Sequence, residues 1–419
     1  MFDNTLPLLT QGYAWLPDLS RRKGPGLVRT RLLGKPAIAL RGPAAVEFFY
    51  DENHVRRRSA LPEPVLSTLF GKGAVHTLDG AEHRQRKALF VTVLKEAAAV
   101  AALARHVAEE WERSSRQWPG HGRITLFDEV SVLLTRAVCA WAGAPIDHRS
   151  GEAEQITRDL IAMVDGFATA GPRHWQARRA RQRQEKRLAQ LIEEVRATSD
   201  HSAQNPSAVR AVALHRDADG ELLDARTAAV EVLNILRPTV AVTWYAVFGA
   251  HALHRRPELR KPLAMNGDDY ARAFAHEVRR FYPFAPFVAG LAPHDVEWRG
   301  EPIPEGTLVL LDLYGQNHDP GLWEAPYSFD PERFTDREPG RDELVPQGGG
   351  EASRGHRCPG EDVTLAVLST VLPRLAQLEY DVPEQDLRIP LKRMPTKPRS
   401  GFVADFPPED SARSQTTRP

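Results

Sequence analysis

One loop decides the fold of this chain, and it reads QGGGEASRGHRCPGE from residue 347 to residue 361. It contains Cys358, one of only two cysteines in 419 residues, and the apolar residues that follow it recur with a helical period. A helix N-terminus and three basic neighbours, Arg354, His356 and Arg357, favour a thiolate, so we expect this thiol to ionise easily. The simplest alternative is a free cysteine in a flexible loop.

A thiolate presented by a glycine-rich loop suits an axial ligand of a haem, since a flat macrocycle needs the backbone close beneath it. Cys139, in contrast, lies in an apolar run and is interpreted as a buried core thiol. Two cysteines make no disulfide framework, which indicates a reducing cytoplasm.

The composition excludes several classes of protein. Lys and Arg together number 55, as do Asp and Glu, so no net field favours nucleic acid or an acidic membrane. The N-terminus has neither the basic nor the apolar region of a signal peptide, and we expect no stretch long and apolar enough to span a bilayer. With 42% hydrophobic residues the chain can bury a sizeable core.

The hydrophobic pattern predicts a mainly α fold with a small β portion. Residues 1–40 are interpreted as irregular chain and short strands, with a hairpin turn at residues 32–36. Most segments between about 41 and 290 are helical in period, the longest of them spanning residues 224–256. A small sheet is expected from residues 295–298 and 307–311, followed by irregular chain up to Cys358. We expect one domain over 1–408 and a disordered tail over 409–419.

Two further motifs precede the cysteine loop. Glu277 and Arg280, three residues apart, share one helix face, and Arg333 in the sequence FDPERF would reach the same carboxylate. This order of motifs resembles the cytochrome P450 superfamily over nearly the whole chain. The resemblance implies a P450 fold with haem b, ligation of the iron by Cys358, and a structural role for Glu277, Arg280 and Arg333 beneath the haem.

One departure narrows the resemblance. The superfamily usually carries Phe seven residues before the cysteine, whereas this chain has Glu351, and its loop is longer. Both features are similar to one branch, the bacterial fatty-acid peroxygenases, which use hydrogen peroxide to hydroxylate or decarboxylate fatty acids.

The longest predicted helix carries Arg237 and Pro238 among apolar residues. Pro238 removes an intrahelical hydrogen bond and is expected to kink the helix. A buried unpaired guanidinium costs several kcal/mol and cannot lose its proton, so it requires a partner. Either an internal carboxylate pairs with it or the side chain reaches water, or else its partner is the carboxylate of a substrate.

The resemblance favours the substrate, because in the peroxygenase branch the Arg-Pro pair binds the fatty-acid carboxylate. The bound carboxylate would then act as the acid and base that peroxide needs. The expected activity is hydroxylation of long-chain fatty acids at the carbon α or β to the carboxylate, decarboxylation to terminal alkenes, or both, with no obligatory redox partner. The alternatives are a monooxygenase fed by a redox partner, which the missing acid-Thr pair disfavours, and a non-catalytic haem-binding sensor.

The remaining candidates follow from the same resemblance. Phe70 is expected to line the fatty-acid channel and His76 to face the haem; alone, His76 would be an ordinary turn histidine. His, where other members carry Gln, tends to accompany decarboxylation. The basic residues His83, Lys87 and Arg57 are assigned to the haem propionates, and the simpler interpretation of these three is a solvated basic face. The substrate channel is assigned Phe287, Ala241, Phe167 and Ala170, for which plain core packing is the simpler interpretation.

Overall fold

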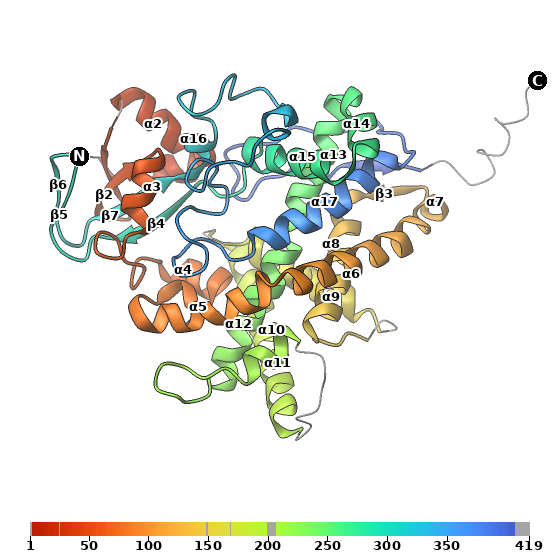
Figure 1. Ribbon diagram of the computed structural model, residues 1–419, viewed down its shortest axis with the longest axis horizontal. Helices are drawn as coiled ribbons and strands as arrows, with labels where there is room; N and C mark the ends of the chain where they lie inside the picture. The colour runs from red at the N-terminus through yellow and green to blue at the C-terminus, as the bar shows by residue number, and fades with distance from the viewer. Residues whose placement is uncertain (1, 25, 148–149, 168, 199–206, 407–419) are drawn as a thin grey trace, which may run out of the picture.

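The computed structural model describes residues 2–24, 26–147, 150–167, 169–198 and 207–406. The chain is mainly helical with a small β portion, as predicted, and the four-stranded sheet lies at the end of the molecule that holds the N-terminus (Figure 1). The extent of the single domain stays a prediction, and the proposed tail over 409–419 lies outside the described residues.

Helices account for most of the described chain. The α-helices are α1 Thr5–Gln11, α2 Trp15–Lys23, α3 Pro43–Tyr50, α4 Glu63–Val65, α5 Gly80–Leu94, α6 Ala97–Ser115, α7 Trp118–His121, α8 Leu126–Ala142, α9 Glu152–Asp165, α10 Pro172–Ala197, α11 Ala208–Ala213, α12 Ala225–Val240, α13 Val242–Arg255, α14 Arg260–Met265, α15 Gly267–Phe281, α16 Leu313–Asn317 and α17 Glu361–Gln377. Short turns of other helix types are η1 Gly12–Ala14, η2 Leu66–Phe70, η3 Val75–Thr77, η4 Pro257–Leu259 and η5 Pro331–Phe334.

The core surrounds α12 and α13, which contact α8, α9, α10, α15 and α17. Apolar side chains cover these two helices on every side rather than along one stripe, and this is the pattern of a helix buried in a large core. The predicted helix over 224–256 is therefore present, but it divides at Ala241. There the N–H of Ala241 still donates to Arg237, while that of Trp244 donates back to Ala241 in a tighter turn. The break thus falls three residues beyond Pro238.

This pair of helices corrects the prediction about membrane-spanning length. Residues 225–255 are long and apolar enough to cross a bilayer by composition alone, with a mean hydropathy of 1.2, but 94% of the most apolar window is buried in the protein. The apolar length is thus accounted for by the core.

The strands are β1 Val28–Leu32, β2 Lys35–Leu40, β3 Arg123–Thr125, β4 Phe287–Leu291, β5 Val296–Trp298, β6 Glu301–Ile303, β7 Leu308–Asp312 and β8 Val403–Asp405. The largest sheet has the order β1-β2-β7-β4. The β1–β2 hairpin turns at Leu33 and Gly34, as predicted, with both residues at positive φ. β5 pairs with β6, whereas β7 pairs in parallel with β2 and antiparallel with β4, so the small sheet expected from 295–298 and 307–311 was wrong.

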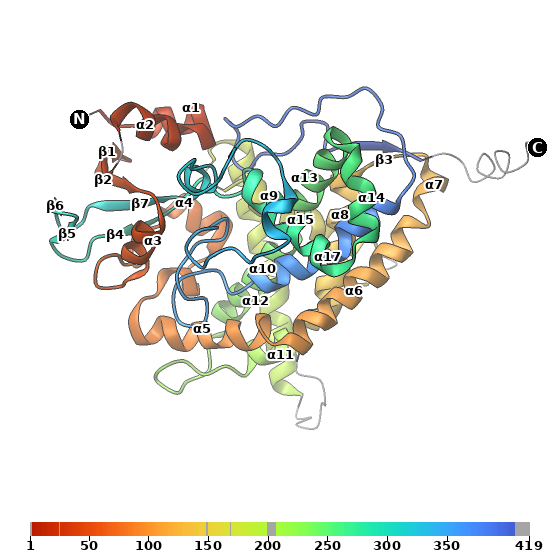
Figure 2. The same cartoon turned by 45° about the horizontal axis from the view of Figure 1, so that its top comes forward.

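The interpretation of residues 1–40 as irregular chain and strands was also wrong in part. α1 and α2 occupy most of the first 23 residues, at the same end of the molecule as the sheet (Figure 2). Pro7 and Pro17 each lie in the first turn of their helix, where a missing N–H removes no intrahelical bond.

Candidate active site

The glycine-rich loop packs directly against α3. A Cβ atom on Gly348 would lie 2.2 Å from the Tyr50 hydroxyl, and one on Gly349 would lie 2.2 Å from a methyl group of Val46. Gly350 has a φ of 74° and a Cβ there would meet the Tyr50 side chain at 2.9 Å. Only glycine allows this approach, so the loop that presents Cys358 is fixed against the sheet end of the molecule.

Cys358 lies just before α17. Its N–H donates to the carbonyl of Gln347 (3.3 Å), and the side-chain amide of Gln347 lies 3.8 Å from the sulfur. Burial raises the pKa of the Cys358 thiol, although the Gly360 N–H and Lys87 lower it. The expectation that this thiol ionises easily was therefore wrong.

The basic neighbours fail to lower that pKa because they are engaged elsewhere. Arg357 pairs with Glu361 at 2.6 Å, and Arg354 is exposed. His356 lies 3.4 Å from Asp79.

A cluster of basic side chains lies beside this loop. The rings of His83 and His356 stack with centroids 3.8 Å apart, and Lys87 donates to the carbonyl of Arg357. The Arg57 guanidinium is buried 4.1 Å above the Phe49 ring. Burial lowers the pKa of Lys87 to about 8 and that of His83 to about 3.

This basic cluster contains two acids that the sequence did not single out. Glu52 lies 3.8 Å from His83 and 3.6 Å from His356. Asp79 accepts a bond from the Arg57 backbone at 2.9 Å.

Buried charges below the loop are fully paired. Arg280 donates to both carboxylate oxygens of Glu277, at 2.6 and 2.7 Å, and Arg333 lies 3.6 Å from the same carboxylate. Arg279 and Arg357 both pair with Glu361, which lowers its pKa to about 2 against the opposing effect of burial. These ion pairs join α15, η5 and α17.

Arg237 differs from these arginines. Its side chain is 4% exposed, and its Nη1 makes no hydrogen bond. It forms no ion pair with any residue in the described part of the chain; its guanidinium lies 5.8 Å from the centre of the Phe70 ring. Burial and the positive Arg181 lower its pKa, yet a guanidinium keeps its proton, so an unneutralised charge remains inside the protein.

Phe70 and His76 lie beside Arg237. Phe70 ends η2 and His76 lies in η3, with their ring centroids 4.4 Å apart. Burial, and then the charges of Arg237 and Lys87, hold the pKa of His76 well below its usual range. The Nδ1 atom of His76 is buried and has no hydrogen-bond partner within the described residues. The imidazole is therefore neutral at pH 7.

The other channel candidates are more dispersed. Ala241 is buried at the break between α12 and α13, one helical turn beyond Arg237. Phe287 lies in β4, with its ring 6.1 Å from that of Trp15. Phe167 is half-buried and Ala170 exposed, both in the connection from α9 to α10. The structure thus brings Arg237, Phe70, His76 and Ala241 together, whereas the channel roles of Phe287, Phe167 and Ala170 stay predictions.

Sequence reasoning missed the residues that hold this group together. Asn234 and Glu231 lie on α12 about one and two turns before Arg237, and Arg181 lies on α10; all three are buried. The signal that identified Arg237, a charged residue in an apolar helix, also exists for Glu231, one of the few charges in the same stretch.

The residues fit a haem b. One face would meet the Cys358 sulfur, and the donors of Arg57, His83 and Lys87 suit the propionates. Four buried polar atoms of these residues have no hydrogen-bond partner in the described chain, and a bound haem and its ligands could supply partners for them. They are Nη1 of Arg237, Nδ1 of His76, Nδ1 of His83 and Oε1 of Gln347. A coordinating thiol loses its proton to the metal, so the raised pKa of Cys358 does not oppose ligation.

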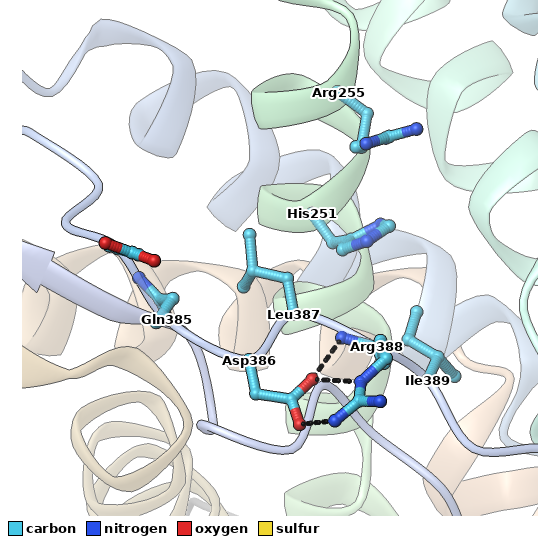
Figure 3. Close-up of a pocket in the computed structure, with 8 residues that line it drawn as sticks. His251, Arg255, Gln385, Asp386, Leu387, Arg388 and Ile389 are labelled. Carbon is cyan, nitrogen blue, oxygen red and sulfur yellow. Dashed lines mark hydrogen bonds and ion pairs between the residues drawn. The ribbon is translucent and has the colours of Figure 1, made fainter.

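A separate cavity of about 830 Å³ opens at the far end of α13. Figure 3 shows His251 and Arg255 on the helix facing the segment 385–389, with Asp386 and Arg388 paired to each other. His251 is bonded to the Tyr282 hydroxyl at 2.8 Å. None of the predicted site residues lines this cavity, and its polar groups are largely satisfied.

The cytochrome P450 family profile matches residues 264–400. Among curated proteins, cytochrome P450 76C3 from Arabidopsis thaliana is 33% identical over 131 residues, which cover 28% of this chain and 25% of that protein. Cytochrome P450 76C4 from the same plant is 37% identical over 116 residues. The match spans about a quarter of the length of these curated relatives.

Solved structures match over nearly the whole chain. Cytochrome P450SP alpha in complex with (R)-ibuprophen is 42% identical, with 97% of this chain and 99% of that chain covered and a TM-score of 0.92. Cytochrome P450EX alpha with myristic acid is 38% identical, with 97% of both chains covered and a TM-score of 0.89. A variant of cytochrome P450 OleT in complex with arachidonic acid is 35% identical, with 97% and 96% covered and a TM-score of 0.92.

Fold, motif order and the extent of these matches lead to one conclusion. The chain belongs to the cytochrome P450 family and, within it, to the bacterial fatty-acid peroxygenase branch.

Proposed function

We propose that this protein uses hydrogen peroxide to hydroxylate long-chain fatty acids at the carbon α or β to the carboxylate, to decarboxylate them to terminal alkenes, or both. The single observation that carries the proposal is the buried guanidinium of Arg237, which no carboxylate within the described residues neutralises. Related enzymes have been solved with myristic acid and with arachidonic acid, and this supports a carboxylate ligand here.

Arg237 binds and orients the substrate. Its planar fork matches a carboxylate in a bidentate pair, and at an effective dielectric of about 20 such a contact is worth roughly 4 kcal/mol before desolvation. Because the cost of burying the guanidinium is already met in the folded protein, the incoming carboxylate gains most of this attraction. Anchoring the head group beside Ala241 and Phe70 places the first carbons of the chain at one fixed depth.

Haem b, held by Cys358 and by the donors of Arg57, His83 and Lys87, supplies the oxidising chemistry when bound. The carboxylate that Arg237 holds takes the first proton of peroxide and returns it to the leaving oxygen. Arg237 keeps its own proton, and Pro238 offers none. His76 contributes the single N–H of a neutral imidazole, because its lowered pKa excludes the imidazolium near pH 7.

We also propose that the protein works without a redox partner and in the cytoplasm. The equal numbers of acidic and basic residues provide no net field toward nucleic acid, and two free cysteines suit a reducing compartment.

The decisive experiment supplies the purified holoprotein with myristate and hydrogen peroxide and identifies the products by mass spectrometry. We expect 2- or 3-hydroxymyristate, the C13 terminal alkene, or a mixture. Turnover only with NAD(P)H and redox proteins would contradict the proposal. An absorption titration with myristate should lose its haem spectral shift in Arg237→Ala and keep it in Arg255→Ala, an exposed arginine of the adjoining helix. An unchanged titration in Arg237→Ala would reject carboxylate anchoring.

A further inference from the structure

The backbone from Leu69 to His76 is fastened by side chains of other elements. Arg181 of α10 donates to the carbonyls of Leu69 (2.7 Å) and Phe70 (2.9 Å). Asn234 of α12 donates to the same Phe70 carbonyl at 3.0 Å. These bonds replace the regular ladder that a helix or strand would provide, so the position of the loop depends on its buried partners.

Glu231 of α12 makes the central contact. Its side chain is 0% exposed, and its Oε1 accepts from the Val75 N–H and from Arg86, both at 2.8 Å. Its Oε2 accepts from Asn234 at 3.2 Å. Val75 immediately precedes His76, so one carboxylate fixes the backbone that carries this imidazole.

The same carboxylate lies on the helix that carries Arg237. Glu231 and Asn234 are three residues apart on α12, as are Asn234 and Arg237, so Asn234 is a helical neighbour of both charged residues. The contact therefore ties the loop with Phe70 and His76 to the helix with the proposed carboxylate anchor.

Arg86 is the cation that pairs with Glu231. Arg86 of α5 takes both Glu231 and Asp217 as partners, with its Nε 3.1 Å from Asp217. It also donates to the Gly73 carbonyl at 3.4 Å. The carboxylate of Glu231 is thus engaged by Arg86 and by the Val75 N–H, and it forms no ion pair with Arg237 in the described structure.

We propose that Glu231 is a positioning residue that holds Phe70 and His76 in fixed register with Arg237 and thereby sets which carbon of the fatty acid is attacked. This inference rests on the proposed function. Displacements of about 1 Å are enough to change a reaction of this kind, so a loosened loop should alter the product ratio before it alters carboxylate binding.

Two variants remove the contact in different ways. Glu231→Met deletes the acceptor for the Val75 N–H. Val75→Pro deletes that N–H and leaves the pair of Glu231 and Arg86 intact; Ala74 (φ −65°, ψ 151°) already has the extended backbone that a following proline requires. Glu231→Gln should rescue, because its side-chain carbonyl keeps an acceptor for the Val75 N–H.

The matched control is Asp159→Asn. Asp159 is also buried, at 2% exposure, and pairs with Arg183, but within the described residues it forms no hydrogen bond or ion pair with residues 69–77. It reports what loss of a buried ion pair does by itself.

We expect Glu231→Met and Val75→Pro to shift the ratio of 2-hydroxy, 3-hydroxy and alkene products at least threefold, with the dissociation constant for myristate, measured calorimetrically, changed less than threefold. Glu231→Gln and Asp159→Asn should stay within twofold of the wild-type ratio. Wild-type ratios in both disruptive variants, or an equal shift in Asp159→Asn, would overturn the inference.

Hydrogen exchange separates this inference from the proposed function. Amides of residues 70–77 should exchange at least tenfold faster in Glu231→Met than in the wild type or in Asp159→Asn. If the wild type makes no product with myristate and peroxide, the proposed function fails, and the exchange rates alone then decide whether Glu231 positions the loop. Unchanged exchange in that variant would reject the positioning role.

Discussion

Two buried arginines, Arg280 and Arg237, show how differently this protein uses the same side chain. Arg280 is 0% exposed and donates to both oxygens of Glu277. Its remaining donors reach the carbonyls of Asn317, Pro326 and Ser328. Arg237 is nearly as buried, at 4%, and has neither an ion pair nor a bonded Nη1 in the described structure.

The difference separates a structural charge from a binding charge. A paired and fully bonded guanidinium joins three elements and has no capacity left for a ligand. An unpaired one lowers the stability of the folded protein and keeps that capacity. Buried charge therefore indicates a binding site in this family member only when its partner is missing.

Removing the paired arginine should have the largest effect. Arg280→Leu leaves the buried carboxylate of Glu277 with Arg333 alone, at 3.6 Å, and should lower the free energy of unfolding by about 3–5 kcal/mol. Urea unfolding followed by circular dichroism would measure it. Arg272→Ala, on the same helix α15 but exposed and paired with Glu338, should change it by less than about 1 kcal/mol. Equal losses in the two variants would erase the distinction.

Removing the unpaired arginine should act in the opposite direction. Arg237→Leu fills the same apolar space without a charge, so it should raise the free energy of unfolding by about 1–3 kcal/mol. Myristate should raise the melting temperature of the wild type and leave that of the variant unchanged. A destabilised variant would show that the guanidinium has a partner in solution and belongs with Arg280.

The pH dependence of stability tests the lowered pKa of His76, to which burial and the unpaired charge of Arg237 both contribute. The His76 pKa is lowered in the folded protein, whereas the unfolded imidazole binds a proton near 6.5. Protons are therefore taken up on unfolding below that pH, and stability falls as the pH falls. Relative to His76→Gln, the wild type should lose about 1.4 kcal/mol for each pH unit below about 6. Parallel urea midpoints for both proteins between pH 7 and 5 would contradict this.

An exposed charge should belong to neither class. Glu351 occupies the position seven residues before Cys358, is exposed, and bonds only to Ser353 among the described side chains. Glu351→Phe should change the free energy of unfolding by less than about 0.5 kcal/mol. A larger change, measured under the same urea conditions, would mean that the carboxylate contributes to the loop fold.

Periodicity was a good guide to the fold where helices bury one broad face. Most segments between about 41 and 290 were predicted to be helical, and the longest of them, residues 224–256, differs by one residue at either end from the span of α12 and α13. The parallel pairing of β2 with β7 could not be predicted, because the two strands lie about 270 residues apart and carry no local signal of their partner.

The residues of the site also differ in whether the sequence alone reveals them. Cys358 and Arg237 stand out in the sequence because their residue types conflict with their surroundings. Glu52, Asp79 and Arg181 acquire their importance only through contacts with distant elements, as do the bonds of Glu231 to Arg86 and Val75. The pKa of Cys358 was mispredicted because burial raises it, while the cations Arg357 and His356 are engaged by acidic partners.

The long apolar pair α12 and α13 also has a consequence for the order of folding. Its covering helix α17 begins at Glu361, more than a hundred residues after α13 ends at Arg255. A nascent or truncated chain that stops before α17 leaves residues 225–255, a segment of bilayer-spanning length, without one of the helices that cover it. We therefore expect this segment to be fully covered only after α17 has been made, so the cysteine loop and the last covering helix of the core are completed together.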